Sequence, residues 1–167
     1  DQPHLVLAIT DSNFGMFQRD VEIAEFIRGL QDKYDWPQAF DFTTGKSHYD
    51  RIMKVNELLR NKFKILVALQ SMNPDTMEII KRKNLTFEQF CDLLRSIKKA
   101  GMQTATDLII PLPLETKESF IGAMRLVAEE GIDLIVPNTL CLLKGTELAS
   151  PDIRNKFEMK SKWRMVA

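Results

Sequence analysis

Side chains able to bind a small polar ligand stand where the apolar segments of this chain end. Carboxylates, amides and hydroxyls hydrogen-bond sugar hydroxyls and amines, and several of them around one opening would form a binding site. The candidates at these ends are Asp11, Asn13, Thr43, Thr44, Gln70, Ser71, Asp107, Glu115, Asn138 and Thr139. Each also has a purely structural explanation, such as capping a helix or completing a turn.

For two charged residues, ligand binding and an ordinary structural or surface role are both well-defined explanations. Asp107 interrupts an apolar segment, and a carboxylate there needs partners, which the hydroxyls of a ribose or an arginine in a structural ion pair would supply. Arg82 carries a planar guanidinium that can hold a carboxylate through two parallel hydrogen bonds. Its neighbours Lys81 and Lys83 equally suit an ordinary solvated surface.

The elements that must position these residues alternate between strand and helix. Apolar runs that read as buried strands occupy residues 5–10, 39–44, 65–69, 104–110 and 134–140. Helical spacing of apolar residues follows at 20–31, 50–61, 75–83, 86–99 and 116–130. Thr86 and Gln89 form a predicted capping box, and Asn73-Pro74 a predicted helix start. Pro137 is expected at a strand end or a bulge, because it cannot donate to a ladder.

This alternation predicts an α/β fold with about five parallel strands. Strands separated by helices pair in parallel through right-handed crossovers. The repeating unit favours a partial TIM-type (β/α) barrel with helices outside over a doubly wound sheet, and in either case the site lies at the carboxyl ends of the strands. We predict a single domain over residues 1–167, with a charged tail from residue 151 that is either helical or frayed.

Composition narrows the function classes. The formal charge is zero, from 23 basic and 23 acidic residues, which argues against a nucleic-acid or anionic-membrane surface. No apolar run is long enough to span a bilayer. The two cysteines have neither disulfide-framework nor metal-ligand spacing and suit a reducing cytoplasm, and no metal site is predicted. The chain begins in a strand, so we expect a piece truncated at its N-terminus.

Several segments, in this order, resemble the radical SAM enzymes, and most closely those with a cobalamin-binding domain. Residues 10–14 read Thr-Asp-Ser-Asn-Phe and look like that branch's D-D-N-F segment. Gln70-Ser71 ends a strand, Arg82 follows twelve residues after Gln70, and Asp107 begins a pattern that continues to Thr116. Within it, residues 111–116 read Pro-Leu-Pro-Leu-Glu-Thr and are similar to the family's G-L-P-G-E-T. Residues 144–148 read Lys-Gly-Thr-Glu-Leu, similar to P-G-T-x-L after the sixth strand. The likeness spans the second to sixth strands of a six-stranded partial barrel.

The resemblance implies a fold, a cosubstrate and site residues. In that family a [4Fe–4S] cluster binds S-adenosylmethionine, whose reductive cleavage gives a 5′-deoxyadenosyl radical or supports methyl transfer. Carried over, Gln70 and Asp107 face the ribose hydroxyls and Arg82 faces the methionine carboxylate. Thr43 stands at a position that is often acidic in relatives. Ser71, Asp11 and Asn13 belong to the same mouth, and the main chain at Cys141 flanks the adenine. The resemblance identifies no catalytic residue and leaves the use of cobalamin open.

The chain also departs from the family pattern. It lacks the C-x-x-x-C-x-x-C segment, so the cluster is expected on a missing N-terminal portion of the same chain. Both glycines of G-L-P-G-E-T are replaced, by Pro111 and Leu114. Two alternatives therefore stay open: a degenerate barrel that acts as a non-catalytic binding or scaffold module, and an unrelated (β/α) barrel enzyme. The edge of residues 5–10 would be unpaired, which predicts dimerisation or aggregation.

Overall fold

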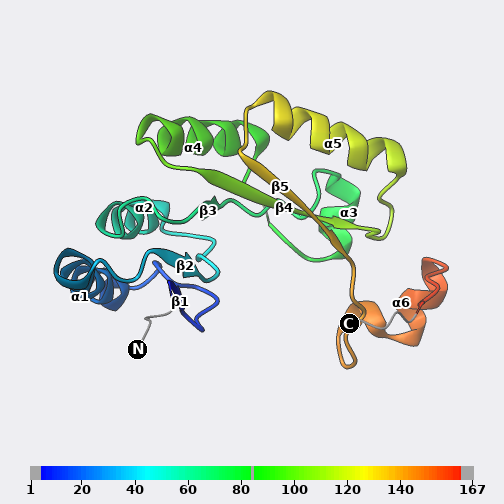
Figure 1. The fold of residues 1–167 in the computed structure, drawn as a ribbon. Coiled ribbons are helices and arrows are strands. Elements are labelled where there is room, and N and C mark those ends of the chain that lie inside the picture. Colours follow the sequence, from blue (N-terminus) through cyan, green and yellow to red (C-terminus); the bar gives the residue numbers. More distant parts are fainter. Residues whose placement is uncertain (1–4, 84, 163–167) are drawn as a thin grey trace.

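The structure is a computed structural model that describes residues 5–83 and 85–162 (Figure 1). Helices and strands follow one another in the order β1 (Val6–Ala8), α1 (Gln18–Tyr34), β2 (Ala39–Asp41), α2 (Tyr49–Leu58), β3 (Ile65–Leu66), α3 (Pro74–Ile79), α4 (Phe87–Lys99), β4 (Thr104–Ile110), α5 (Lys117–Glu129), β5 (Leu134–Thr139), the 3₁₀ helix η1 (Glu147–Ala149) and α6 (Pro151–Lys156). All ladders between these strands are parallel. The predicted α/β fold with five parallel strands is confirmed.

The strands form two sheets, one of β1 and β2 and one in the order β3-β4-β5. Strands β1, β2 and β3 are shorter than predicted, and beyond their ladders pairing continues only through single bridges, Phe14 with Thr44 and Gln70 with Leu108. Between β2 and β3 a side chain makes a connection, because the Leu66 N–H donates to Thr44 Oγ1 at 3.2 Å. Within each sheet the strand order follows chain order, while the joining of the two sheets into a partial barrel stays a prediction.

Two apolar clusters hold the helices to the sheets. The larger cluster joins α4 and α5 to the three-stranded sheet through fully buried residues such as Phe90, Leu108 and Val127. The smaller cluster packs α1 on α2 and the first sheet, and Figure 1 shows these two helices side by side. Phe63 contacts both clusters. Each fully buried apolar side chain contributes about 1.5–3 kcal/mol, so these clusters fix where the strand ends lie.

Local signals in the sequence set the helix ends. Thr86 Oγ1 accepts the Gln89 N–H at 3.2 Å and Gln89 Oε1 accepts the Thr86 N–H at 3.0 Å, which confirms the predicted capping box. Asn73 caps α3 with proline at its first turn, also as predicted. The tail is helical over α6, while residues 163–167 lie outside the described part. No helix among the described residues is both long and apolar enough to cross a bilayer.

Pro137 differs from the expectation. It pairs with Leu108 inside β5 rather than at a strand end or a bulge. β5 is an edge strand, and the Leu140 N–H donates to Ile110 O at 2.9 Å toward β4. Because successive N–H groups alternate in direction along a strand, the nitrogen of Pro137 faces away from β4. No ladder bond is lost, which is why proline is tolerated on an edge strand.

Candidate functional site

The segment that follows β3 pairs with the middle of β4 through the main chain of Gln70. Its N–H donates to Asp107 O at 2.8 Å, and its carbonyl accepts the Ile109 N–H at 2.7 Å. Gln70 is 8% exposed and has φ of 64°. The Asp107 carboxylate is partly exposed and accepts a hydrogen bond from Asn138 Nδ2 at 3.2 Å. The structure thus brings together Gln70, just after β3, Asp107, in the middle of β4, and Asn138, near the end of β5.

Ser71 and Glu115 fasten the turn at residues 111–115 to the start of α3. The Ser71 hydroxyl donates to Glu115 Oε2 and accepts the Asn73 N–H at 3.0 Å. Asn73 Nδ2 donates to Leu114 O at 3.1 Å, and Thr76 Oγ1 donates to Pro113 O at 2.9 Å. The other Glu115 oxygen accepts from the Ser119 hydroxyl. Ser71 and Glu115 therefore have a structural role that holds the strand end beside the turn.

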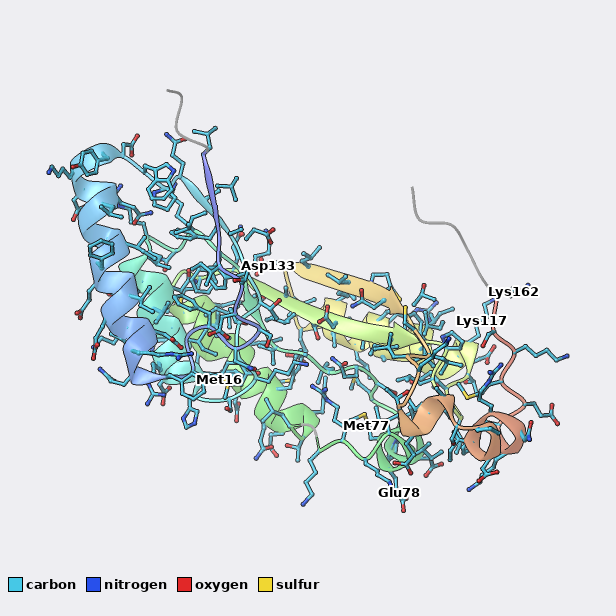
Figure 2. The ribbon with its side chains drawn as sticks, turned by 90° about the horizontal axis from the view of Figure 1, so that it is seen from below. Met16, Met77, Glu78, Lys117, Asp133 and Lys162 are labelled. Carbon is cyan, nitrogen blue, oxygen red and sulfur yellow. The ribbon has the colours of Figure 1, made fainter. Side chains whose placement is uncertain are left out.

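The position of Arg82 follows from how the preceding helix, α3, ends. The predicted helix ran to residue 83, but α3 stops at Ile79. The Lys81 N–H donates to Glu78 O at 3.0 Å and the Arg82 N–H to Met77 O at 3.1 Å, while Lys81 has φ of 52°. These two bonds form a Schellman motif, with lysine in the left-handed position usually taken by glycine. The motif turns the chain back, so that Arg82 lies on a loop beside the end of β3. Figure 2 shows Met77 near the carboxyl end of β4 and Asp133 at the opposite end of the strands.

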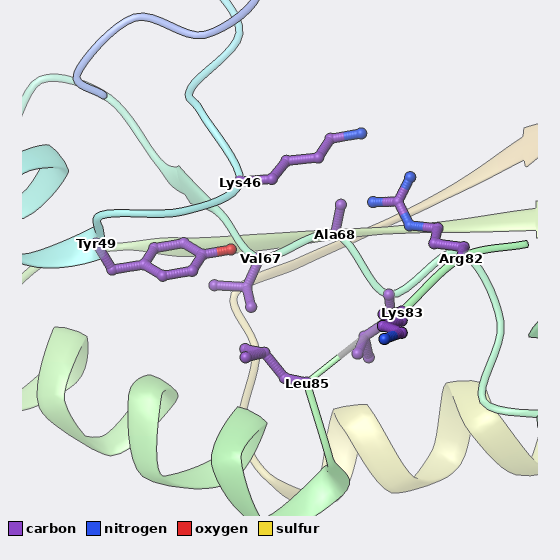
Figure 3. Close-up of a pocket in the computed structure, with 8 residues that line it drawn as sticks. Lys46, Tyr49, Val67, Ala68, Arg82, Lys83 and Leu85 are labelled. Atoms are coloured by element: carbon purple, nitrogen blue, oxygen red, sulfur yellow. The ribbon is translucent and has the colours of Figure 1, made fainter. Parts of the chain in front are cut away.

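A pocket of about 380 Å³ opens beside this loop (Figure 3). Its lining residues are Lys46, Tyr49, Val67, Ala68, Leu69, Arg82, Lys83 and Leu85. Three of them are cationic, and the segment after β3 supplies an apolar floor. Of the predicted site residues, Arg82 lines the pocket. Lys46 and Tyr49 were missed by the sequence reasoning, although a cation directly after the Thr43-Thr44-Gly45 strand end is the kind of signal that marks such a mouth.

Charges around the pocket act on one another. Burial lowers the pKa of Lys46, the positive charge of Arg82 lowers it further, and Asp107 acts in the opposite direction. Burial raises the pKa of Tyr49, partly offset by Arg82. Lys46, Arg82, Tyr49 and Asp107 therefore belong to one electrostatic group, although they come from three separate segments of the chain.

The remaining predicted residues lie around this group without lining the pocket. Thr43 is exposed, three residues before Lys46. Asp11 accepts the Asn13 N–H at 2.8 Å and pairs with Arg19 at 3.3 Å. The loop that contains Asp11 and Asn13 runs beside the end of β2, because Phe14 in this loop forms a bridge with Thr44. The helix cap that Asp11 and Asn13 could have supplied comes instead from Asp20, whose carboxylate accepts the N–H groups of Gly15 and Phe17, both at 2.9 Å.

The cysteines do not make a metal site. Cys141 is exposed after β5, where its Sγ lies 3.6 Å from Thr139 O. Cys91 is buried in α4, and burial raises the pKa of its thiol. Within the described ranges no group of three or more histidine, cysteine or acidic side chains is arranged to hold a metal ion. Iron–sulfur clusters are held mainly by several thiolates, so the described residues do not fit such a cluster.

Comparison with known proteins relates the chain to one group of enzymes. No family model matches the sequence. It is 28% identical over 128 residues to the cobalamin-dependent radical SAM methyltransferase TokK of Streptomyces tokunonensis, and equally to a 2-(S-pantetheinyl)-carbapenam-3-carboxylate methyltransferase of Streptantibioticus cattleyicolor. Each match covers 75% of this chain and 19% of the relative. A tRNA-2-methylthio-N(6)-dimethylallyladenosine synthase of Bacillus cereus is 28% identical over 164 residues, which is 92% of this chain and 32% of that protein.

The chain thus spans about a fifth of the length of the two methyltransferases. Among solved structures, coproporphyrinogen III oxidase (HemN) from Escherichia coli, titled a radical SAM enzyme, superposes with a TM-score of 0.49 at 18% identity. That superposition covers 92% of this chain and 45% of the other. On the sequence matches, the chain is a relative of the radical SAM enzymes.

Proposed function

We propose that this chain is part of the barrel of a radical SAM enzyme and binds S-adenosylmethionine at the carboxyl ends of its strands. In this proposal residues 1–167 form one partial barrel domain, with the described strands as the second to sixth. The observation that carries the proposal is the joining of Gln70 to Asp107 beside the pocket of Arg82, in a chain related to enzymes of that class. Each of these residues was predicted from the sequence.

The residues fit the parts of S-adenosylmethionine by their chemistry. Asp107 is a partly exposed carboxylate beside an amide, which suits two vicinal ribose hydroxyls. Arg82, next to a pocket with apolar walls, suits a carboxylate. We assign the adenine to the main chain near Ile109 and Cys141, and assign Thr43, Asp11, Asn13 and Ser71 to the rim. The cosubstrate would supply the 5′-deoxyadenosyl radical or the methyl group, while these residues bind and orient it.

We propose the [4Fe–4S] cluster for the whole protein, and we assign none of its ligands to the residues described. The described cysteines do not fit it, so its cysteine ligands would come from a further portion of the same protein. The name of one relative includes cobalamin, and two relatives are named methyltransferases. We therefore extend the proposal to methyl transfer with cobalamin, in a cytoplasmic protein whose partner is a small molecule.

Equilibrium dialysis with radiolabelled S-adenosylmethionine tests the proposal. The Asp107→Asn variant removes the anionic acceptor and keeps the shape, so affinity should fall about tenfold, as expected for loss of charge-assisted hydrogen bonds. Asp50→Asn, an exposed position on α2, is the matched control and should bind as the unmodified protein does. Equal affinities for the two variants would contradict the assigned role of Asp107.

A second candidate is a binding or scaffold module that has kept the fold and lost the cosubstrate. It is favoured by Leu114, which has φ of 63° at a position where the family uses glycine, and by the side chains that fasten this turn to α3. Calorimetry separates the two functions. A folded, cluster-loaded protein that gives no heat with S-adenosylmethionine would support the module and refute the enzyme.

A further inference from the structure

The pocket beside Arg82 has an excess of positive charge. Lys46, Arg82 and Lys83 line it, and none of its eight described lining residues is acidic. Figure 3 shows the Lys46 ammonium and the Arg82 guanidinium directed toward the same space above Ala68. Asp107 is near enough to act on Lys46, but it lies outside the lining. A partly desolvated space between two cations favours an anionic occupant.

Lys46 is held in this place by the packing on either side of it. Thr44 is buried and bridges to Phe14, and the Gly45 N–H donates to Phe14 O at 3.2 Å. A Cβ on Gly45 would collide with the side chain of Met16, so this segment packs closely against the loop before α1. Tyr49, also in the lining, begins α2 on the other side. The main chain of Lys46 is therefore fixed near the mouth of the pocket.

The charges show what a bound anion would change. Without a ligand, Arg82 repels the Lys46 ammonium and, after burial, is the second cause of its lowered pKa. A carboxylate placed between the two cations would add two attractions that outweigh this repulsion. The lysine is a compact charge with three donors, and the arginine has a planar fork, so the two can share one carboxylate without competing for the same geometry.

We propose that Lys46 is a second cation of the carboxylate site, so that Lys46 and Arg82 together hold the carboxylate of the methionine part of S-adenosylmethionine. This inference rests on the proposed function and adds to it a binding residue that the family likeness does not assign. The same two cations could hold an anionic group of another substrate, and binding measurements with and without the carboxylate distinguish these sources.

The test compares two ligands and four proteins by equilibrium dialysis, with the complete protein that contains this chain. The ligands are S-adenosylmethionine and its decarboxylated form, which lacks the carboxylate and is otherwise the same. The variants are Lys46→Met, Lys46→Arg and, as a matched control, Lys54→Met at an exposed position of α2. Circular dichroism on each variant checks the fold.

The unmodified protein should bind S-adenosylmethionine more tightly than the decarboxylated ligand. Lys46→Met should weaken binding of S-adenosylmethionine about tenfold and leave the decarboxylated ligand unchanged. Lys46→Arg keeps the charge and should retain most of the preference, and Lys54→Met should retain all of it. If Lys46→Met does not fold, Lys46→Arg still tests the contact. It should lose a smaller part of the affinity for S-adenosylmethionine and none of the affinity for the decarboxylated ligand.

Three outcomes overturn the inference, and they are separable. Equal loss for both ligands would make Lys46 a structural residue, and no loss for either would assign the pocket to another anion. In both cases binding to the unmodified protein would still support the proposed function. Failure of the unmodified protein to bind either ligand would refute the proposed function and the inference with it.

Discussion

At the scale of single residues, two residues of the candidate site other than glycine have a left-handed backbone conformation. Gln70 has φ of 64° and Leu114 has φ of 63°. For residues with a Cβ this region costs about 1–2 kcal/mol each. The hydrogen bonds of Gln70 to β4, and those of Asn73 and Thr76 to the turn, offset part of this cost. Such local strain is common where a chain must present groups to a ligand.

Leu114 gives a prediction about this strain. Leu114→Gly should have a free energy of unfolding about 1 kcal/mol higher than Leu114→Ala, because both lose the side chain and only alanine keeps the Cβ clash at positive φ. Urea unfolding of the two variants measures the difference. In an ordinary helix interior the order is reversed, and finding that reversed order here would contradict the left-handed conformation.

Asp133 gives a prediction about pH. Its carboxylate accepts the hydroxyl and the N–H of Thr104, both at 2.7 Å, and these bonds lower its pKa below the usual 3.8 despite some burial. A pKa lowered by folding means that the stabilisation is present above pH 3.8 and is lost as pH falls through the folded-state value. Asp133→Asn should therefore cost about 1 kcal/mol at pH 7, after allowance for solvent exposure, and less below pH 3.8.

Chemical denaturation at several pH values measures this dependence. Asp92→Asn is the control, because Asp92 pairs with Arg95 on the surface and both side chains are 67% exposed. Its substitution should change stability little at either pH. A cost for Asp133→Asn that stays constant from pH 7 to pH 3 would show that the charge of Asp133 does not supply the stabilisation.

At the scale of elements, the short helix α3 depends on tertiary contacts. Six residues are too few for a helix to be stable alone. Its first turn is capped by Asn73 and fastened to the turn at residues 111–115, and its last turn ends in the Schellman motif before Arg82. The position of Arg82 is thus a consequence of contacts between α3 and the turn at residues 111–115, which is distant in the sequence.

Ser71 connects these elements and gives the corresponding prediction. Ser71→Ala removes the hydroxyl that donates to Glu115 and accepts from Asn73, at a position only 2% exposed. Unpaired buried groups cost about 1–3 kcal/mol, so the free energy of unfolding should fall by that amount. Ser96→Ala, on the exposed face of α4, is the control. Hydrogen exchange of the α3 amides should also become faster, and unchanged exchange there would argue against this connection.

At the scale of the whole molecule, the first sheet has an open edge. β1 pairs with β2 on one side, and among the described strands no other pairs with it. Leu5 is 57% and Val6 50% exposed along this edge. An apolar edge with unpaired main-chain groups favours association with another strand. In the proposed full barrel, the preceding strand of the same protein would cover it.

The 167-residue chain should therefore form dimers or larger species at high concentration, as measured by multi-angle light scattering. Val6→Lys places a charge on the edge and should shift the distribution toward monomer. Leu143→Lys, a 65% exposed apolar position beyond β5, is the control and should leave association unchanged. A monomeric unmodified chain would contradict the prediction.

Most elements could be predicted because their signals are local. The strands at residues 104–110 and 134–139, the capping box of Thr86 and Gln89, and the start at Asn73-Pro74 follow from side-chain pattern and capping chemistry, which depend on neighbours in the sequence. The early end of α3 and the placement of Pro137 inside β5 were not predictable in this way. The early end of α3 depends on Lys81 in a left-handed conformation after the helix, and the position of Pro137 depends on β5 being the edge strand of its sheet.

The sequence by itself determined the succession of strands and helices, the strands in or after which Asp107 and Gln70 lie, and the relationship to radical SAM enzymes. Only the tertiary structure decided that Ser71 and Glu115 hold a turn, that Asp20 rather than Asp11 caps α1, and that Lys46 faces the pocket of Arg82. The reason is physical. Pattern and capping act over a few residues, whereas the field at the pocket depends on charges 36 positions apart in the sequence, which packing of the sheets brings together.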